Sequence, residues 1–334
     1  MPGLRRNVPG MKRRYELLPQ MRQYDKMGFD WTPYVMLRNQ PNFSSEVFNT
    51  DDHGFRYTWH DNERLDYQMF QNQVGYKGVV SGGSAAFGVG ASDDTKTIPS
   101  LLNLESETLW FNFGGRGFNS TQELLIFLFY LPKVRRVLLL SGVNNLVSHM
   151  VAARYILPYG GFVADRPFHQ LNYRTSRQEL LRQLIPGKLR RLVPLRRGAS
   201  QPIDYQQRFD ESLKVVERDL EVWRILRDNK EFSLLYCLQP VAYWTQKNYS
   251  PEEQELFSIL DHHQGPQWIN LFKRIAECYS QYAERLNAMC DAKEIPFLDG
   301  NKLLPAEGWS FCDRTHLTDE GSVKLVSALR SELT

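Results

Sequence analysis

Short apolar runs alternate with longer amphipathic segments over most of this chain. Five of the runs are continuous and end in turn residues, which is typical of buried strands. They span residues 76–81, 108–113, 136–141, 232–238 and 295–298. Helical spacing of apolar positions begins at Asn119, Phe209, Pro266 and Thr318. Because parallel strands need crossover connections, this alternation predicts an α/β fold, with a mainly parallel five-stranded sheet and helices on both of its faces.

Residues 1–72 do not follow this alternation. They contain the stretch YDKMGFDWTPYVMLRNQPNFSSEVFNTDDHGFRYTWH, which is rich in aromatic and turn residues and has little periodicity. Disordered tails are usually poor in aromatic residues. We therefore expect residues 1–72 to form an ordered arm that packs on an α/β domain spanning residues 73–334.

The overall composition is that of an ordinary globular protein. Of the 334 residues, 42% are hydrophobic and 24% are charged, which is enough to bury a substantial core. No segment approaches the roughly 18 uninterrupted apolar residues of a membrane span. The basic residues near the start are not followed by an apolar segment. These features predict a cytoplasmic protein.

The cysteine and histidine residues form no metal-site pattern. The cysteines make no Cys-x-x-Cys pair and no Cys/His ligand spacing, so we expect reduced thiols at Cys237, Cys278, Cys290 and Cys312. Cys312 is interpreted as a small apolar filler. The adjacent His262 and His263 lie in a polar stretch without a third ligand, which favours an exposed loop. Neither a metal nor a cofactor is expected.

Positive charge is concentrated in one part of the chain. The net charge is +3, yet residues 154–198 hold ten Lys or Arg against two acidic residues, a local balance of +8 that leaves about −5 elsewhere. This segment belongs to an insertion at about residues 150–204. Three interpretations remain open: a solvated helical pair, a lid that attracts an anionic substrate, and a patch that contacts an acidic membrane or protein surface. Nucleic acid is not an expected partner, because no nucleic-acid-binding motif accompanies the charge.

Chemically versatile residues follow four of the predicted strands. Ser84 comes after the first strand, in the small-residue stretch GVVSGGSAAFGVG. Gly117 follows the second strand, Asn144 follows the third, and Asp313 and His316 follow the last. Ligands of such sheets bind at the carboxyl ends of the strands, where these residues are expected to meet. Ser84 alone could equally be a helix N-cap in a tight turn.

Together these residues supply every role of nucleophilic acyl transfer. A serine hydroxyl attacks only when a base takes its proton, and a histidine base needs a carboxylate on its other nitrogen. Ser84, His316 and Asp313 would form such a catalytic triad. The backbone N–H groups of Ser84 and Gly117 and the side-chain amide of Asn144 would form the oxyanion hole.

The order of these residues resembles that of the SGNH hydrolase superfamily, also called GDSL-like esterases. Its Gly-Asp-Ser, Asn-Gly and Gly-x-Asn-Asp blocks are similar to residues 82–84, 112–117 and 142–145, and its Asp-x-x-His block is met by Asp313 and His316. The stretch NTDDHGFR, residues 49–56, is similar to an N-terminal signature of many members. There are two departures: Gly83 and Asn145 stand where the family has aspartate. Neither position carries a reacting role, but both bear on the rigidity of the loops around the site.

The resemblance implies a flavodoxin-like three-layer α/β/α fold and a serine esterase. Ser84 would form an acyl-enzyme with a small-molecule acyl ester, and water would release the acyl group without a metal or cofactor. Two alternatives remain open. An acyltransferase would use the same Ser-His-Asp site with a hydroxyl or amine in place of water, and a noncatalytic binding protein would use only the scaffold. The acyl group, the alcohol and the oligomeric state are not determined at this stage.

Overall fold

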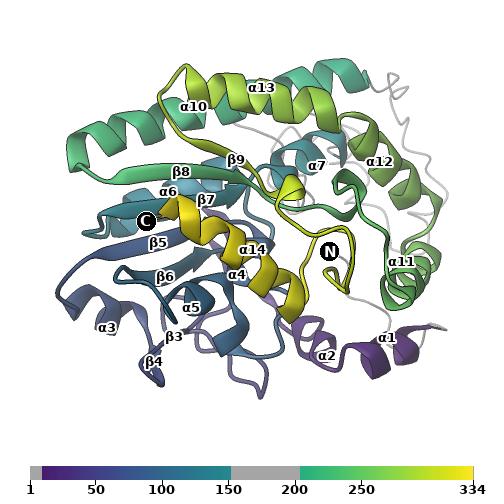
Figure 1. The fold of residues 1–334 in the computed structure, drawn as a ribbon, viewed down its shortest axis with the longest axis horizontal. Coiled ribbons are helices and arrows are strands. Elements are labelled where there is room, and N and C mark those ends of the chain that lie inside the picture. Colours follow the sequence, from purple (N-terminus) through teal and green to yellow (C-terminus); the bar gives the residue numbers. More distant parts are fainter. Residues whose placement is uncertain (1–9, 152–203, 334) are drawn as a thin grey trace, which may run out of the picture.

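The computed structural model describes residues 10–151 and 204–333 (Figure 1). The basic insertion therefore lies almost wholly outside the described residues, and its three interpretations stay predictions. Within the described ranges, no helix is both long enough and apolar enough to cross a membrane.

A five-stranded sheet forms the centre of the molecule. Its strands are β5 (Lys77–Gly82), β6 (Leu109–Gly114), β7 (Arg136–Ser141), β8 (Ser233–Leu238) and β9 (Phe297–Asp299). They lie in the order β6-β5-β7-β8-β9, and every neighbouring pair is parallel. All residues of β5 and β6 are buried, as expected for a sheet that is covered on both faces. The predicted α/β fold is thus confirmed, and the sheet is entirely parallel.

Successive side chains of the strands enter two different cores. In β7, Val137 and Leu139 pack in the first core, whereas Leu138 and Leu140 pack in the second. The first core contains residues of α6 (Ser120–Tyr130), α7 (Val143–Val151), α10 (Tyr205–Lys230), α12 (Pro266–Glu277) and α13 (Tyr279–Asp291). The second contains residues of α4 (Ser84–Phe87), α5 (Ile98–Leu102), α11 (Pro251–Gln264) and α14 (Asp319–Leu333). Helices therefore cover both faces of the sheet in three layers (Figure 1).

The strands end at matching levels. Gly82 of β5 pairs with Gly114 of β6 on one side and with Leu140 of β7 on the other. Because the three strands run in the same direction, the segments that follow them leave the sheet at one edge. This register places the segments that carry Ser84, Gly117 and Asn144 at a common edge, as the sequence pattern predicts.

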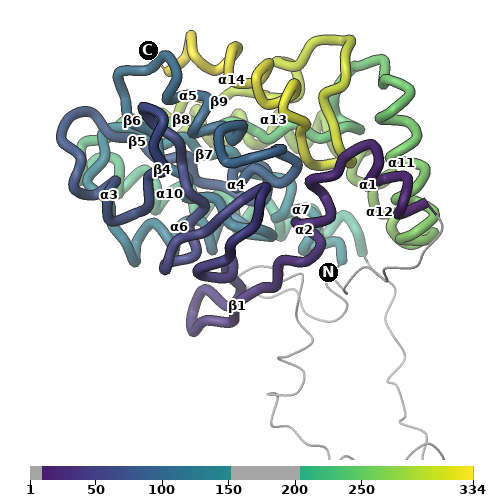
Figure 2. Tube along the Cα trace, turned by 90° about the horizontal axis from the view of Figure 1, so that it is seen from below, coloured from purple at the N-terminus to yellow at the C-terminus, as the bar shows by residue number. Residues whose placement is uncertain are grey.

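The N-terminal part contains short helices and two hairpins. Its elements are α1 (Met11–Leu17), α2 (Met21–Tyr24), the hairpin of β1 (Phe29–Thr32) and β2 (Met36–Asn39), the hairpin of β3 (Thr58–His60) and β4 (Glu63–Leu65), and α3 (Tyr67–Asn72). Met21 and Tyr24 pack with Phe87 and Val89, which follow the end of β5. Figure 2 shows the beginning of the arm in purple, with α1 beside α11 and the chain passing through α2 to β1. The division of the chain at residue 72 stays a prediction.

Two local expectations were wrong. The helical pattern that begins at Pro266 contains two helices, α12 and α13, which meet at Cys278. The pattern hides this break because Ile275 and Tyr282, on either side of it, pack in the same core. The second error concerns His262 and His263, which lie in the last turn of α11 and not in a loop. That helix continues through its polar residues as far as Gln264.

Candidate active site

Ser84 is the first residue of the four-residue helix α4 and comes two positions after the end of β5. The N-cap of this helix is Gly83, so the Ser84 hydroxyl does not serve as the cap. Gly82 must be small because a Cβ there would lie 2.1 Å from the carbonyl oxygen of Leu140. The small residues before Ser84 thus bring the start of α4 close to β7.

The structure brings the three residues of the predicted triad together. The Nε2 atom of His316 lies 2.7 Å from Oγ of Ser84, although the two residues are 232 positions apart. The Nδ1 atom of His316 lies 2.7 Å from Oδ2 and 2.9 Å from Oδ1 of Asp313. His316 is buried, whereas Ser84 is partly exposed. This arrangement can move a proton between the serine oxygen and the imidazole.

The carboxylate of Asp313 is held in its charged form. Burial by itself raises the pKa of Asp313, but the charge of His316, its hydrogen bond and the Thr315 backbone N–H outweigh burial and lower this pKa to about 2. Oδ1 also accepts from the backbone N–H groups of Thr315 and His316, at 2.8 and 3.0 Å. An ionised Asp313 favours the tautomer with a proton on Nδ1, which leaves Nε2 free to accept a proton from Ser84.

The loop that carries Asp313 and His316 is fixed at both ends. An antiparallel bridge joins Phe311 to Leu317, and the Cys312 N–H donates to the carbonyl of His316. The buried carboxylate of Glu253 accepts from the N–H groups of Ser310 and Phe311, each at 2.9 Å. These bonds explain how a short Asp-x-x-His segment can hold both side chains in one orientation.

Cys312 has the role expected from the sequence. It is fully buried, and its thiol lies 3.4 Å from the carbonyl oxygen of His316. Burial raises the pKa of this thiol well above its ordinary value, so it stays protonated. In the described ranges, no group of three or more His, Cys, Asp and Glu side chains could hold a metal ion.

Of the predicted oxyanion donors, the side-chain amide of Asn144 lies beside Gly83, the residue before Ser84. Nδ2 of Asn144 donates to the carbonyl of Phe118 at 2.7 Å, which ties α7 to the segment after β6. Gly117, the residue before Phe118, has a φ of +77° in a turn closed by the bond from the Phe118 N–H to the Gly115 carbonyl. The N–H of Ser84 is in the first turn of α4, where backbone donors lack intrahelical acceptors. These positions suit the predicted oxyanion hole, whose role stays a prediction.

The two departures from the family pattern have structural reasons. A Cβ at Gly83 would lie 2.5 Å from Nδ2 of Asn144, so this backbone has no room for the usual aspartate. Asn145 is fully buried; its Oδ1 accepts from the Ser120 N–H at 3.0 Å, and its Nδ2 donates to the Ser120 hydroxyl at 2.8 Å. Gly83 therefore admits Asn144 to the site, and Asn145 joins α7 to the start of α6.

A residue of the arm also holds the segment after β6, which the sequence pattern does not predict. Asn39 donates from Nδ2 to the Gly114 carbonyl at 3.1 Å and accepts at Oδ1 from the Arg116 N–H at 3.0 Å. It thereby holds the segment that leads to Gly117. Nothing in the hydrophobic pattern marks Asn39, since a polar residue in a short hairpin is ordinarily exposed. The stretch 49–56 did carry a signal, but only as a resemblance without an assigned role.

Among the comparisons with known proteins, only the one with solved structures found matches. No protein-family model and no curated protein matches the chain. Among solved structures, a proposed acylhydrolase from Bacteroides fragilis is 12% identical, with a TM-score of 0.44, over 80% of this chain and 92% of the other. A GDSL-like lipase from Bacteroides thetaiotaomicron is 13% identical, with a TM-score of 0.41, over 77% and 87%. A proposed arylesterase from Agrobacterium tumefaciens is 12% identical, with a TM-score of 0.42, over 77% and 98%. The chain is thus similar over most of its length to structures that bear esterase, lipase and acylhydrolase names.

Proposed function

We propose that this chain is a serine hydrolase of the SGNH kind, which cleaves an acyl ester through an acyl-Ser84 intermediate. The observation that supports this most directly is the continuous series of hydrogen bonds from Ser84 through His316 to Asp313. A network that served only stability would have no need to leave its serine exposed. Here Ser84 is partly exposed while His316 is buried, so an electrophile can reach the hydroxyl that the buried base activates.

The first half of the reaction forms the acyl-enzyme. Nε2 of His316 takes the hydroxyl proton as Oγ of Ser84 attacks the acyl carbon, and Asp313 stabilises the imidazolium that results. The carbonyl oxygen becomes an oxyanion, which the N–H groups of Ser84 and Gly117 and the amide of Asn144 receive. When the tetrahedral species collapses, the bond to the alcohol oxygen breaks and His316 returns its proton to that oxygen.

The second half releases the acyl group. Water occupies the place that the alcohol has left, gives a proton to His316 and attacks the acyl carbon of the Ser84 ester. Collapse of the second tetrahedral species breaks the bond to Oγ, and His316 returns the proton to Ser84. The products are a carboxylic acid, an alcohol and the original enzyme, so no external oxidant or cofactor is needed to balance the reaction.

The test is intact-protein mass spectrometry after treatment with a fluorophosphonate probe. We expect a single adduct on the unmodified protein and none on Ser84→Ala. Ser81→Ala is the matched control, because Ser81 is a buried serine of β5 only three positions away and should not affect labelling. A folded unmodified protein that gains no adduct, or an equal adduct on Ser84→Ala, would contradict the proposal.

The same protein can distinguish hydrolysis from acyl transfer. A panel of aryl esters of different acyl length is incubated with and without added alcohols and amines, and the acyl products are separated. A hydrolase gives mainly free acid in both conditions. Predominant transfer of the acyl group to an added acceptor would identify an acyltransferase, and ester binding without turnover would identify a binding protein.

A further inference from the structure

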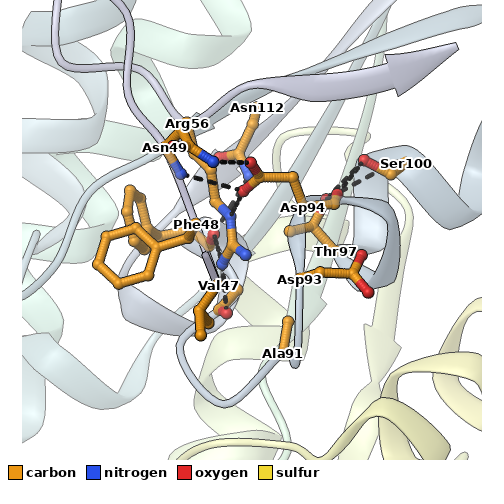
Figure 3. Close-up of polar contacts among 12 residues, drawn as sticks. Val47, Phe48, Asn49, Arg56, Ala91, Asp93, Asp94, Thr97, Ser100 and Asn112 are labelled. Atoms are coloured by element: carbon orange, nitrogen blue, oxygen red, sulfur yellow. Dashed lines mark hydrogen bonds and ion pairs between the residues drawn. The ribbon is translucent and has the colours of Figure 1, made fainter. Parts of the chain in front are cut away.

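A buried arginine from the arm lies against the helix that begins with Ser84. Arg56 has no solvent exposure, and Figure 3 shows it among polar residues from several segments. Its Nη1 donates to the carbonyl oxygens of Gly88 at 2.7 Å and Phe87 at 3.4 Å. These carbonyls are at the C-terminal end of α4, where the helix dipole favours a positive charge.

Asp94 fixes the orientation of this guanidinium. Nε of Arg56 donates to Oδ1 of Asp94 at 2.8 Å, and both side chains are almost completely buried. Asn49 donates to the same carboxylate from its side-chain amide, at 2.9 Å from Oδ2, and from its backbone N–H, at 3.3 Å from Oδ1 (Figure 3). Asp94 is thus itself held in place, and Arg56 has little freedom to turn away from α4.

Aromatic rings surround the rest of the guanidinium. Its central carbon lies 5.7, 5.4 and 5.5 Å from the ring centroids of Tyr24, Phe48 and Phe87. The hydroxyl of Tyr24 accepts from Nη1 at 2.8 Å and lies 2.9 Å from the carbonyl oxygen of Gly88. Within residues 10–151 and 204–333, Nη2 has no hydrogen-bond partner, and the facing rings provide its electrostatic stabilisation.

The position of Gly88 is directly connected to that of Ser84. The N–H groups of Gly88 and Val89 each donate to the Ser84 carbonyl at 3.0 Å. Gly88 has a φ of +88°, so the chain turns sharply at the point where Arg56 binds it. Because α4 has only four residues, a displacement of its C-terminal end cannot be absorbed before it reaches Ser84.

We propose that Arg56, oriented by Asp94, is a positioning residue for Ser84: it holds the C-terminal end of α4 so that Oγ stays in line with Nε2 of His316. This inference rests on the proposed function and extends it to residues of the N-terminal arm. Its alternative is that the network only fastens the arm to the domain. A fastening role would change the stability of the protein but not the reactivity of Ser84 in the folded molecule.

Two substitutions test the positioning role, with one control. Arg56→Lys keeps the charge but loses the fork that joins Asp94 to the carbonyls of α4. Tyr24→Phe removes a single hydroxyl from the network. The control is Arg227→Lys, since Arg227 also donates to two backbone carbonyls, at 2.6 and 3.1 Å, but these follow α13 and are far along the chain from α4.

Two quantities are measured for each protein, alongside its melting temperature. The first is the reactivity of Ser84, measured as the rate constant for fluorophosphonate labelling and as kcat and KM for an aryl ester. We expect Arg56→Lys to lower the labelling rate and kcat by about 10²-fold with little change in KM, because a misplaced nucleophile slows the reaction but not binding. Tyr24→Phe should show a smaller decrease, and Arg227→Lys none. The second is amide hydrogen exchange at Gly88 and Val89, which should accelerate in Arg56→Lys and Tyr24→Phe but not in Arg227→Lys.

The outcomes separate this inference from the proposed function. Unchanged labelling and exchange in folded Arg56→Lys would overturn the positioning role while leaving the hydrolase proposal intact. If the unmodified protein is never labelled, the hydrolase proposal fails, and exchange at Gly88 and Val89 alone decides whether Arg56 holds α4. If Arg56→Lys does not fold, Tyr24→Phe decides by the same measurements. If Arg56→Lys has a lower melting temperature but is labelled at the normal rate when folded, the network only fastens the arm to the domain.

Discussion

Two adjacent asparagines show how differently neighbouring side chains are used. Asn144 directs its amide nitrogen past Gly83 to the Phe118 carbonyl, beside the proposed nucleophile. Asn145 points into the interior and makes both of its side-chain hydrogen bonds to Ser120. In the proposed function the first serves the reacting group, whereas the second joins α6 to α7. Their substitutions should therefore separate an effect on catalysis from an effect on stability.

Asn144→Ala is expected to lower kcat by roughly 10²- to 10³-fold with nearly unchanged KM, because its amide meets charge that develops only in the transition state. Asn145→Ala should have the milder effect on kcat. It should instead lower the free energy of unfolding by about 1–3 kcal/mol, since it leaves a buried donor of Ser120 unpaired. The measurements are steady-state kinetics and chemical denaturation of both variants. The reverse assignment of effects would show that the oxyanion residue was misidentified.

Glu123 of α6 is a buried carboxyl group whose pKa is shifted. It is buried and accepts a hydrogen bond from the Ser141 hydroxyl at 2.8 Å. Burial, with a smaller contribution from the charge of Asp219, raises the pKa of Glu123 from 4.5 to about 8. At neutral pH the folded protein therefore holds a proton that the unfolded chain releases.

This proton makes stability depend on pH. Between pH 4.5 and about 8 the folded state binds more protons than the unfolded state, so the free energy of unfolding falls as pH rises, by at most about 1.4 kcal/mol per pH unit. Glu123→Gln resembles the protonated form and removes this contribution. We expect its stability relative to the unmodified protein to increase from pH 5 to pH 8 and then to level off.

Denaturation at several pH values measures the effect, and Glu255→Gln provides the control. Glu255 pairs with Arg13 on the surface, and this hydrogen bond lowers its pKa below 4.5, so it is ionised in both states above pH 5. The difference in the free energy of unfolding between Glu255→Gln and the unmodified protein should not vary with pH in this range. If the corresponding difference for Glu123→Gln is also independent of pH, Glu123 is ionised in the folded protein.

At the scale of secondary structure, the junction of β5 and α4 sets the geometry of the site. Gly82 lets the backbone approach β7, Gly83 leaves space for Asn144, and Gly88 turns the chain after a single helical turn. The φ of Gly83 is −79°, which any residue can adopt. Its requirement for glycine is therefore one of space beside Asn144 and not of backbone conformation.

Gly83→Ala should consequently affect activity more than folding. The added Cβ would lie 2.5 Å from Nδ2 of Asn144 and 3.3 Å from the Phe118 carbonyl, so the amide must move away from the oxyanion position. We expect kcat to fall by roughly 10²-fold, the range seen when one oxyanion donor is lost, with a small change in melting temperature. Gly28→Ala is the control, because a Cβ there meets only the end of the Gln40 side chain at 3.4 Å. An unchanged kcat in Gly83→Ala would show that Asn144 is not a donor.

At the scale of the whole molecule, the arm contacts the segments that carry the proposed site. Asn39 of the arm holds the segment before Gly117, and Arg56 of the arm holds the helix of Ser84. Gln20 also donates to the carbonyl of Gly90 at 2.9 Å. The arm is therefore more than a cover for the domain, since it contacts the two segments that follow β5 and β6.

The basic insertion yields a further prediction at this scale, which follows from its sequence because residues 152–203 lie outside the described structure. If its charge steers an anionic substrate, the quadruple change Arg190→Gln, Arg191→Gln, Arg196→Gln and Arg197→Gln should lower kcat/KM for an anionic ester. Added salt should lower the same quantity for the unmodified protein. Activity on a neutral ester should survive both treatments. Equal responses of the two esters across a salt series would refute steering and favour a solvated helical segment.

The amino-acid sequence by itself determined the α/β architecture and the identities of the proposed triad. A strand that is apolar on both faces must be covered on both sides. Because helical segments lie between the strands along the chain, they can provide this cover as crossovers, and the pattern predicts a parallel sheet. Asp313 and His316 are also local, because three residues of spacing allow one loop to pair them. The motif order then indicated Ser84 as their partner.

Only the tertiary structure decided how these parts meet. It places Oγ of Ser84 at 2.7 Å from a histidine 232 positions away, and it makes Gly83, and not Ser84, the N-cap of α4. It also brings Arg56 and Asn39 of the arm into hydrogen bonds with the carbonyls of Gly88 and Gly114. A separation of hundreds of residues does not fix a distance in space, and a hydrogen bond depends on tenths of an ångström. Such contacts are therefore set by the packing of the arm, the sheet and the loops together, and no local pattern records them.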